Sequence, residues 1–497
     1  MKSSNYLLSI SEYILEILVV FVIFRSVINT LGLDYLGVWS LAMSLTALTS
    51  VGSSGFASSA VKFVSVSFTD KDLEKCRQIV STTLVTVAIV SSVMSMLIYA
   101  VFKLTGDTYF KEFEYSLLTS ILLLTFLSFI LGSIGRVFQS SLDGMLAIKK
   151  RSLIGISSKV IYLISSLVLI KNYGLIGLTW ALIARELFIV IVSAINLQRD
   201  LHFFILRSKY IKLSIFKEIF SYGYKFQINS IIWMLTDPLT KFLIKDFGGL
   251  SALGLFEVVY KLFWQVRMLI VVVMNTYLPL LASKKENISS QFSRFYNFTL
   301  SSSIILLALI FPVMPIVMSL LDLSDVNAVY FASVILFVSL FFNLIGTVAY
   351  THNLASGDLN GNLLNTIIFA VVNIAFGYVL GKYFSFEGVL VGWLIAHVTS
   401  SSYLLYSYCN KHKIPVSEII NWDYIKLFLT SGLAVACLCL LCVSLELNFI
   451  ILSVLCSIVL LGIYFLQFKF SDKFRQPILF IYQKLRPSGL ELKSSNN

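Results

Sequence analysis

Residues 221–281 read SYGYKFQINSIIWMLTDPLTKFLIKDFGGLSALGLFEVVYKLFWQVRMLIVVVMNTYLPLL. They contain two apolar segments, each long enough to cross a bilayer, because about 20 helical residues span its hydrocarbon core. The same segments carry charged side chains at depths that hydrocarbon does not tolerate, namely Lys225, Asp237, Lys241, Glu257, Lys261 and Arg267. A charge at that depth needs water or a partner, so we expect these helices to line an internal polar cavity.

The rest of the chain has the same apolar character. Of its 497 residues, 58% are hydrophobic, and the mean hydropathy is +0.87, which excludes an ordinary soluble protein. We predict an all-α polytopic membrane protein with fourteen transmembrane helices in two related bundles around a central cavity. The apolar runs are residues 7–28, 37–56, 79–102, 117–138, 153–170, 175–197, 226–244, 250–277, 298–321, 328–350, 363–384, 388–408, 427–445 and 449–468.

The lysine and arginine positions predict the orientation, because short cytoplasmic loops collect positive charge. With a cytoplasmic N-terminus, the segments outside hold only Lys103, Lys111, Lys171, Lys245 and Lys382, and the other loop and tail bases fall inside. Both termini are therefore predicted to be cytoplasmic. The net charge of +12 follows mostly from this bias and from attraction to anionic lipid, so we expect membrane lipid and no nucleic acid as a partner.

Five segments are expected along the chain. Residues 1–197 form an N-terminal bundle of six helices, and residues 222–408 form a C-terminal bundle of six more. Between them, residues 198–221 are basic and rich in Phe, Leu and Ile, which favours an interfacial helix on the inner leaflet and a plain linker about equally. Residues 409–468 add two peripheral helices with almost no charge, and residues 469–497 form a basic cytoplasmic tail.

The sequence contains an internal echo. LDYLGVWSL at 33–41 and LSALGLFEV at 250–258 share a leucine, a Leu-Gly pair and an aromatic residue two positions later, at an offset of 217 residues. The triplet LIA recurs at 182–184 and 394–396. Each echo is short, but together they suggest duplicated halves, which is a common plan among transporters.

Charges inside the helices indicate the character of the cavity. At roughly 3 kcal/mol each, they would cost about 40 kcal/mol if they faced lipid, so they must face a polar interior. Bases outnumber acids, which predicts a cationic site made of Arg25, Arg136, Lys159, Arg185, Lys225, Lys241, Lys261 and Arg267. The acids are Glu12, Glu16, Glu186, Asp237 and Glu257.

Some of these charges have alternative roles. Asp237 with Lys241, and Glu257 with Lys261, are four residues apart, so each pair is also a candidate for an intrahelical ion pair. Adjacent helix residues point about 100° apart, so we expect Arg185 and Glu186 to address different neighbours. His352 and His397 are interpreted first as hydrogen-bonded packing residues and second as proton carriers.

The chain resembles the lipid-linked oligosaccharide flippases that export O-antigen and capsular repeat units, within the multidrug and polysaccharide exporter superfamily. The resemblance covers nearly the whole chain and rests on diffuse patterns rather than a catalytic motif. They are YLGVWSLAMSL (35–45), VGSSGFASSAVKF (51–63), FQSSLDGMLAIKKRSLI (138–154), YGYKFQINSI (222–231), DPLTKFLIKDFGG (237–249), LGLFEVVYKLFWQVRMLI (253–270) and YLPLLAS (277–283).

This resemblance implies two bundles that enclose a cationic cavity and alternate access to the two sides of a bacterial inner membrane. The implied cargo is a polyprenyl-pyrophosphate-linked glycan, whose anionic headgroup the bases would hold. No bond is broken, so we expect no enzyme and no cofactor. Asp237, Glu257 and His352 are candidates for coupling to H⁺ or Na⁺, and a polysaccharide polymerase and a chain-length regulator are expected partners.

Two other functions are weighed against this one. A multidrug cation antiporter of the same superfamily should present an acidic cavity, whereas bases predominate here. A membrane polysaccharide polymerase or ligase should have a large outer loop, whereas the outer loops here are short. The sequence shows no nucleophile or metal-ligand constellation.

Overall fold

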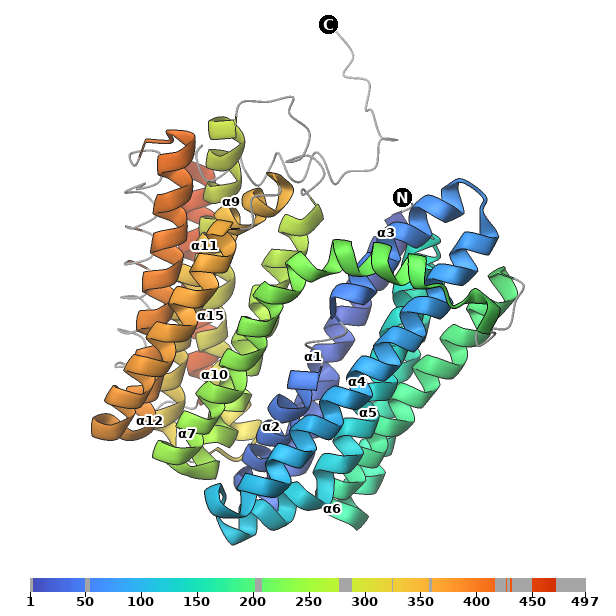
Figure 1. The fold of residues 1–497 in the computed structure, drawn as a ribbon. Helices are drawn as coiled ribbons and strands as arrows, with labels where there is room; N and C mark the ends of the chain where they lie inside the picture. The colour runs from blue at the N-terminus through green and yellow to red at the C-terminus, as the bar shows by residue number, and fades with distance from the viewer. Residues whose placement is uncertain are drawn as a thin grey trace, which may run out of the picture. The chain divides into compact units, whose positions relative to one another are not determined.

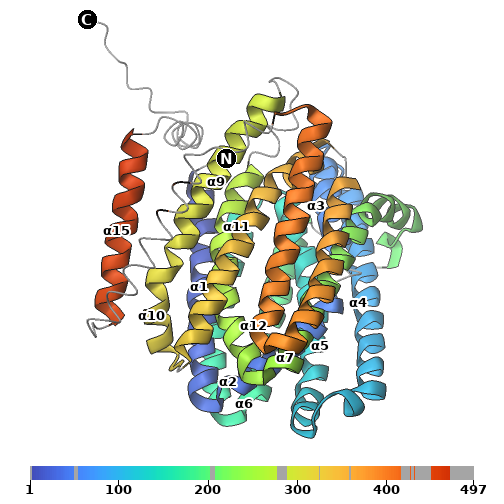
Figure 2. The same cartoon turned by 90° about the vertical axis from the view of Figure 1, so that its left-hand side faces the viewer.

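The computed structural model describes residues 3–49, 54–201, 208–276, 288–323, 325–356, 360–415 and 449–470, with residues 426 and 430. Every regular element within these ranges is a helix (Figures 1 and 2). Seven helical stretches among them are long and apolar enough to cross a membrane. The chain divides into two compact units, which are Met1–Val258 with Gly381–Val389, and Val259–Leu380 with Leu390–Asn497.

Helix α5 lies at the centre of the first unit, where it packs against α2, α3, α4 and α6, while α1 packs against α2 and α6. The buried core between them includes Phe56, Ile79, Val137 and Leu197. The elements are α1 Ser3–Leu31, α2 Leu33–Ala47, α3 Ser54–Thr69, α4 Leu73–Tyr109, α5 Glu112–Gly144, α6 Ile148–Leu201, the 3-10 turn η2 Ser208–Tyr210 and α7 Leu213–Thr276.

Two long helices contain the same break. Helix α6 has 54 residues, which at about 1.5 Å per residue is far longer than a bilayer is thick. Its backbone leaves the helical conformation at Gly174 (φ 57°, ψ −137°). Helix α12, Asn360–His412, leaves it at Ser385 with nearly the same angles (φ 53°, ψ −138°). These matching turns support the predicted duplication of the chain.

A second pair of breaks precedes the two echoed sequences. Gly32, between α1 and α2, has φ 105° and ψ 167°, and Gly249, inside α7, has φ 82° and ψ 178°. Both angles lie where only glycine is unstrained. The two glycines are 217 residues apart, which is the offset of the echo, so the repeat begins one residue earlier than the sequence comparison placed it.

The beginning of α7 runs across the end of the first bundle before the helix turns to run with the others (Figure 1). Ile215 and Ile219 are buried in the core of this unit. Phe216 and Phe220 stack on each other, and each ring centroid lies 6.3 Å from that of Phe56. Residues 198–221 thus contain the end of α6, the turn η2 and the first turns of α7. That this segment lies on a membrane surface stays a prediction.

The second unit contains the end of α7 from Val259 onward and the remaining helices, apart from residues 381–389 of α12. Helix α11 packs against α9, and α10 lies beside α15 (Figure 2). Tyr464 of α15 donates a hydrogen bond of 3.3 Å to the carbonyl of Ile304 on α9. The bounds are α9 Ile288–Ala308, α10 Ile310–Leu320, α11 Val326–Ser356, α12 Asn360–His412 and α15 Phe449–Phe470.

The predicted apolar runs overlap these helices or the limbs of the broken ones. The exception is the run at 427–445, which lies outside the described residues except for residue 430. The all-α membrane fold is therefore confirmed, and the count of fourteen helices stays a prediction.

Candidate functional site

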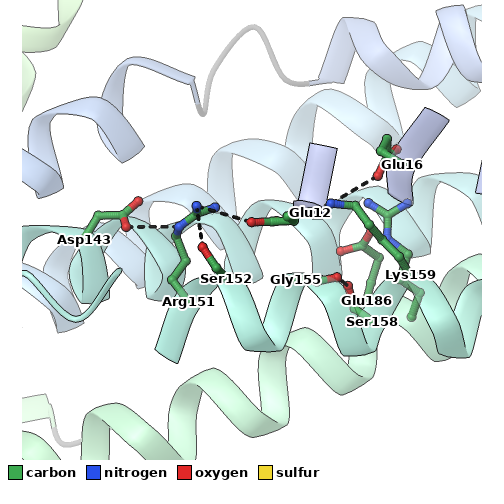
Figure 3. A network of polar contacts seen from close by, with 10 residues as sticks. Glu12, Glu16, Asp143, Arg151, Ser152, Gly155, Ser158, Lys159 and Glu186 are labelled. Carbon is green, nitrogen blue, oxygen red and sulfur yellow. Dashed lines mark hydrogen bonds and ion pairs between the residues drawn. The ribbon is translucent and has the colours of Figure 1, made fainter. Parts of the chain in front are cut away.

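Two glutamates of α1 and two bases of α6 form the network in Figure 3. Glu12 and Glu16 are one turn apart, so they share a face of α1, and Arg151 and Lys159 share a face of α6. The Lys159 ammonium lies 3.2 Å from Glu12 Oε1 and 3.4 Å from Glu16 Oε2. Arg151 Nη2 lies 3.3 Å from Glu12 Oε2. Lys159, predicted to bind substrate, is thus held by two carboxylates.

The network extends to the end of α5 and depends on a glycine. Arg151 Nε lies 3.1 Å from Asp143 Oδ1, so the guanidinium bridges Asp143 and Glu12 (Figure 3). A Cβ on Gly155, which lies between Arg151 and Lys159 on α6, would come within 2.1 Å of Glu12 Oε1. The missing side chain at this position makes room for the carboxylate.

Three further charges of this bundle, Arg136, Arg185 and Glu186, lie on α5 and the second limb of α6. The expectation that Arg185 and Glu186 address different neighbours is wrong, because Arg185 Nε lies 3.4 Å from Glu186 Oε1. Long side chains can bend toward each other even where their Cβ atoms diverge. Gly132 makes room for Glu186, since a Cβ there would lie 3.0 Å from Oε2. Arg136 differs from Arg185, because it is exposed and donates a 2.7 Å hydrogen bond to the hydroxyl of Ser133.

Lys241 of α7 is paired with two carboxylates of the same helix. Its buried ammonium lies 3.0 Å from Glu257 Oε2 and 3.4 Å from Asp237 Oδ2, which confirms the intrahelical Asp237–Lys241 pair. Ser40 of α2 donates a 2.6 Å hydrogen bond to the same oxygen of Glu257. Glu257 thus pairs with Lys241, and the alternative pairing with Lys261 is not among the ion pairs of the described residues.

Lys245 lies one turn beyond Lys241 and is also buried. Its ammonium is 3.2 Å from Glu114 of α5 and 2.9 Å from Asp246. It also lies 4.6 Å from the ring centroid of Tyr109, whose hydroxyl donates to Asp246. Sequence reasoning placed Lys245 in an outer loop. The spacing of 237, 241 and 245 along one helix face could have indicated its burial.

In the second unit, six side chains of α7, α11 and α12, among them Arg267, form a closed ring of contacts. Arg267 Nε donates a 2.6 Å hydrogen bond to Asn343 Oδ1, and its guanidinium lies 4.5 Å from the Trp264 centroid. Asn343 Nδ2 lies 3.5 Å from His397 Nδ1. The ring closes through the aromatic contacts of His397 with Trp393, Trp393 with Tyr260, and Tyr260 with Trp264. Arg267 is thereby fixed on two sides while remaining half-buried.

His352 lies in a separate aromatic cluster of the second unit. Its Nδ1 is 3.1 Å from the hydroxyl of Tyr408, and its ring contacts those of Phe292 and Phe295. The imidazole is 7% exposed. This arrangement matches the interpretation as a packing residue, and its coupling role stays a prediction.

Three predicted bases remain. Arg25 is exposed on α1, and Lys261 is half-buried in α7; neither makes an ion pair with a described residue. The side chain of Lys225 lies outside the described part of the structure. That the eight predicted bases form one site stays a prediction. Lys159, Arg185 and Lys241 hold carboxylates, whereas Arg25, Arg136 and Lys261 do not among the ion pairs that the structure describes.

Among the described residues, no group of three or more His, Cys, Asp or Glu side chains is placed to hold a metal ion. The charged networks consist of hydrogen bonds and ion pairs. A carboxylate in such a network can take up and release a proton.

A family model described as "Polysaccharide biosynthesis protein" matches residues 3–285. No curated protein matches the chain. Among solved structures, the lipid II flippase MurJ in an inward closed conformation is similar at a TM-score of 0.69 and 15% identity, covering 94% of this chain and 99% of that one.

Two further solved structures have a similar fold. An inward-facing multidrug resistance MATE family transporter of the MOP superfamily matches at a TM-score of 0.68 and 15% identity, over 80% of this chain and 94% of that one. A MOP superfamily transporter from Pyrococcus furiosus, described with a binding pocket of reverse polarity, matches at a TM-score of 0.60 and 14% identity, over 82% and 95%. At these identities the likeness concerns the fold.

Proposed function

The chain belongs to the polysaccharide biosynthesis protein family, and from this premise we propose that it is a flippase for polyprenyl-pyrophosphate-linked oligosaccharide repeat units. The observation that carries the proposal is the combination of this family with a transporter fold. A fold shared with transporters favours movement of a lipid-linked glycan over its synthesis. The proposed location is the bacterial inner membrane, with both termini cytoplasmic.

The headgroup of such a cargo is anionic and strongly hydrated. Arginine and lysine replace that hydration with charge-assisted hydrogen bonds, while the prenyl tail can stay in lipid. The bases already held by carboxylates are less suited to this role, which leaves Lys261, Arg136 and Arg25 as the proposed contacts. A base inside the membrane that has no ion pair with a described residue costs free energy on insertion, and this cost suggests a functional role. Lys261 is the strongest of these candidates because it is half-buried, whereas Arg25 and Arg136 are exposed.

Coupling to an ion gradient is part of the proposal. Glu257 and Asp237 share the ammonium of Lys241, so protonating either acid, or binding a cation there, would weaken its hold on Lys241. His352 is the third candidate. A polysaccharide polymerase and a chain-length regulator are the proposed protein partners, because a flipped repeat unit is the substrate that a polymerase consumes.

The experiment is to delete the gene, extract lipid-linked oligosaccharides and determine which leaflet holds them by lectin access in spheroplasts. We expect single repeat units to accumulate on the inner leaflet. Unpolymerised units on the outer leaflet would instead indicate a polymerase or ligase.

A multidrug cation antiporter is the second candidate, and the likeness to a multidrug transporter fold favours it. An unchanged glycolipid pool together with increased sensitivity to cationic drugs would support this function and contradict the flippase.

A further inference from the structure

In the second unit, helix α7 has one buried side and one half-open side. Val259 and Phe263 are fully buried in this unit, whereas Lys261 and Trp264 are half-buried. Residues three apart in a helix are neighbours on its surface, with Cβ atoms about 5–6 Å apart, so Lys261 and Trp264 lie side by side. The half-open side of α7 therefore presents an ammonium group next to an indole ring.

Both side chains carry hydrogen-bond donors that have no protein acceptor in the part of the chain that the structure describes. Neither the ammonium of Lys261 nor the indole N–H of Trp264 donates to a described residue. The two groups are also not sealed inside the protein, because the buried side-chain atoms without a hydrogen bond in the described ranges do not include them. A tryptophan N–H normally finds a partner when it is buried, and an unsatisfied polar group in a membrane costs free energy. Two adjacent, accessible donors of this kind indicate a polar ligand.

The indole ring of Trp264 is held in place by its neighbours. The guanidinium of Arg267 lies 4.5 Å from the ring centroid, and the ring of Tyr260 lies 5.5 Å away, centroid to centroid. Each neighbour is fixed from another helix, since Arg267 Nε donates to Asn343 of α11 at 2.6 Å and Tyr260 meets Trp393 of α12 edge to face at 5.9 Å. A side chain braced in this way loses little conformational freedom on binding, which suits it to a fixed binding surface.

The chemistry of an indole matches a sugar better than a phosphate. It carries no charge, offers one N–H donor and is otherwise apolar. A sugar ring has the same two characters, because its hydroxyl oxygens accept hydrogen bonds and its C–H groups form an apolar surface. An ammonium group suits a phosphate. In a polyprenyl-pyrophosphate-linked glycan the pyrophosphate is bonded directly to the first sugar, so the groups that bind them must be neighbours, as Lys261 and Trp264 are.

We propose that Trp264 is the contact for the first sugar of the cargo, beside Lys261 at the pyrophosphate. This inference rests on the proposed function, because it takes the cargo to be a lipid-linked glycan. The indole N–H donates to an oxygen of the sugar, and the ring covers part of the sugar's apolar surface. Trp264 thereby distinguishes a glycosylated lipid from the bare polyprenyl pyrophosphate, whereas Lys261 binds both.

The test is a binding measurement on the purified full-length protein in nanodiscs with two probes. One probe is the lipid-linked glycan extracted from cells that lack the gene, and the other is undecaprenyl pyrophosphate without a sugar. We expect Trp264→Ala to weaken binding of the glycosylated probe at least tenfold and to keep binding of the bare probe within twofold. Lys261→Ala should weaken binding of both probes to the same extent.

Two further variants sharpen the measurement. Trp264→Phe keeps an aromatic ring and loses the N–H, so it should weaken binding of the glycosylated probe alone, by about twofold to tenfold. This variant also decides the matter if Trp264→Ala does not fold. The control is Trp180→Ala on α6, which removes an indole that is 49% exposed and should change neither affinity.

Equal weakening of both probes by the Trp264 variants would assign the ring to packing and overturn the sugar contact. Unchanged binding of both probes, or an unmodified protein that binds the two probes equally tightly, would overturn it as well. The flippase proposal is judged separately by the leaflet assay. A normal leaflet distribution in the deletion strain, together with selective weakening by Trp264→Ala, would refute the flippase and retain the sugar contact.

Discussion

At the scale of single residues, the partners of a base decide whether it is available to a cargo. Lys159 and Lys261 look alike in the sequence, since both are lysines within apolar helices. The structure separates them, because Lys159 lies between Glu12 and Glu16 whereas Lys261 has no ion pair with a described residue. A base that already neutralises carboxylates contributes to holding helices together, and an unpaired one is poised to bind an anion.

We predict that Lys261→Ala impairs export by roughly ten-fold to hundred-fold, because a hydrogen bond to a charged group contributes about 1.5–3 kcal/mol. Lys261→Arg should retain most of the activity. The measurement is the outer-leaflet glycolipid by lectin access, with Lys171→Ala and Lys382→Ala as controls on exposed bases. Equal losses in all three alanine variants would argue against a cationic site.

Glu12→Gln is expected to destabilise the protein by about 1.5–3 kcal/mol, because it weakens the charge-assisted hydrogen bonds that hold Arg151 and Lys159 in a half-buried network. The measurement is the thermal unfolding midpoint of the purified protein in detergent. Asp200→Asn removes the exposed pair with Lys150, which should contribute about 0–1 kcal/mol. A midpoint for Glu12→Gln no lower than that of Asp200→Asn would contradict the structural role of the network.

The sequence predicted which residues are charged within the membrane but not how they pair. Ion pairs between residues one helical turn apart can be recognised from the sequence, as Asp237 and Lys241 show. Pairs such as Lys159 with Glu12 join residues 147 positions apart, and they depend on how two helices are rotated toward each other. Lys245 was missed for a related reason, because its partner Glu114 lies on another helix.

At the scale of elements, the same turn is built with two different residues. Gly174 in α6 and Ser385 in α12 have nearly identical backbone angles, in a region that strongly favours glycine. A glycine can be recognised in the sequence as a possible break. The break at Ser385 has no such signal, so only the comparison with its equivalent turn in the first half explains it.

Exchanging glycine and serine at these two positions is expected to change the stability of the protein in opposite directions. Gly174→Ser should destabilise the protein by about 1–3 kcal/mol, because it places a side chain on a positive-φ backbone. Steric exclusion is not the cause, since the nearest atom to a Cβ there is 3.6 Å away. Ser385→Gly should leave stability unchanged or raise it by up to about 1 kcal/mol. Thermal unfolding midpoints of the two variants would reveal the difference, and equal shifts would rule out backbone strain.

At the scale of the whole molecule, apolar runs and charge positions were enough to predict an all-α membrane protein. The runs predict helices because each has the length of a bilayer crossing. The short echo at residues 33 and 250 also anticipated a structural repeat. The sequence could not show that the two copies touch each other, since an internal repeat is equally compatible with copies that lie far apart.

Export is expected to depend on an ion gradient through Glu257. Collapsing the proton gradient with a protonophore, or the sodium gradient with an ionophore, should slow export in energised vesicles. Glu257→Gln should remove this dependence, because a neutral amide holds Lys241 equally at all proton or sodium activities. Export at an undiminished rate in de-energised vesicles of the unmodified protein would exclude coupling.

Two contacts join residues to their own repeat equivalents, since Ser40 donates to Glu257 and Ser251 donates to Asp34, each 217 residues apart. These contacts bear on the origin of the chain. In a symmetric dimer of identical subunits, a residue on the axis faces a copy of itself. Asp34 would then face a second aspartate, and two like charges would repel. Within one gene the copies diverge independently, so aspartate faces serine at one contact and serine faces glutamate at the other. Joining two copies in one polypeptide thus allowed each half to supply one hydrogen-bond acceptor and one donor. A homodimer of identical subunits cannot form this arrangement on its axis.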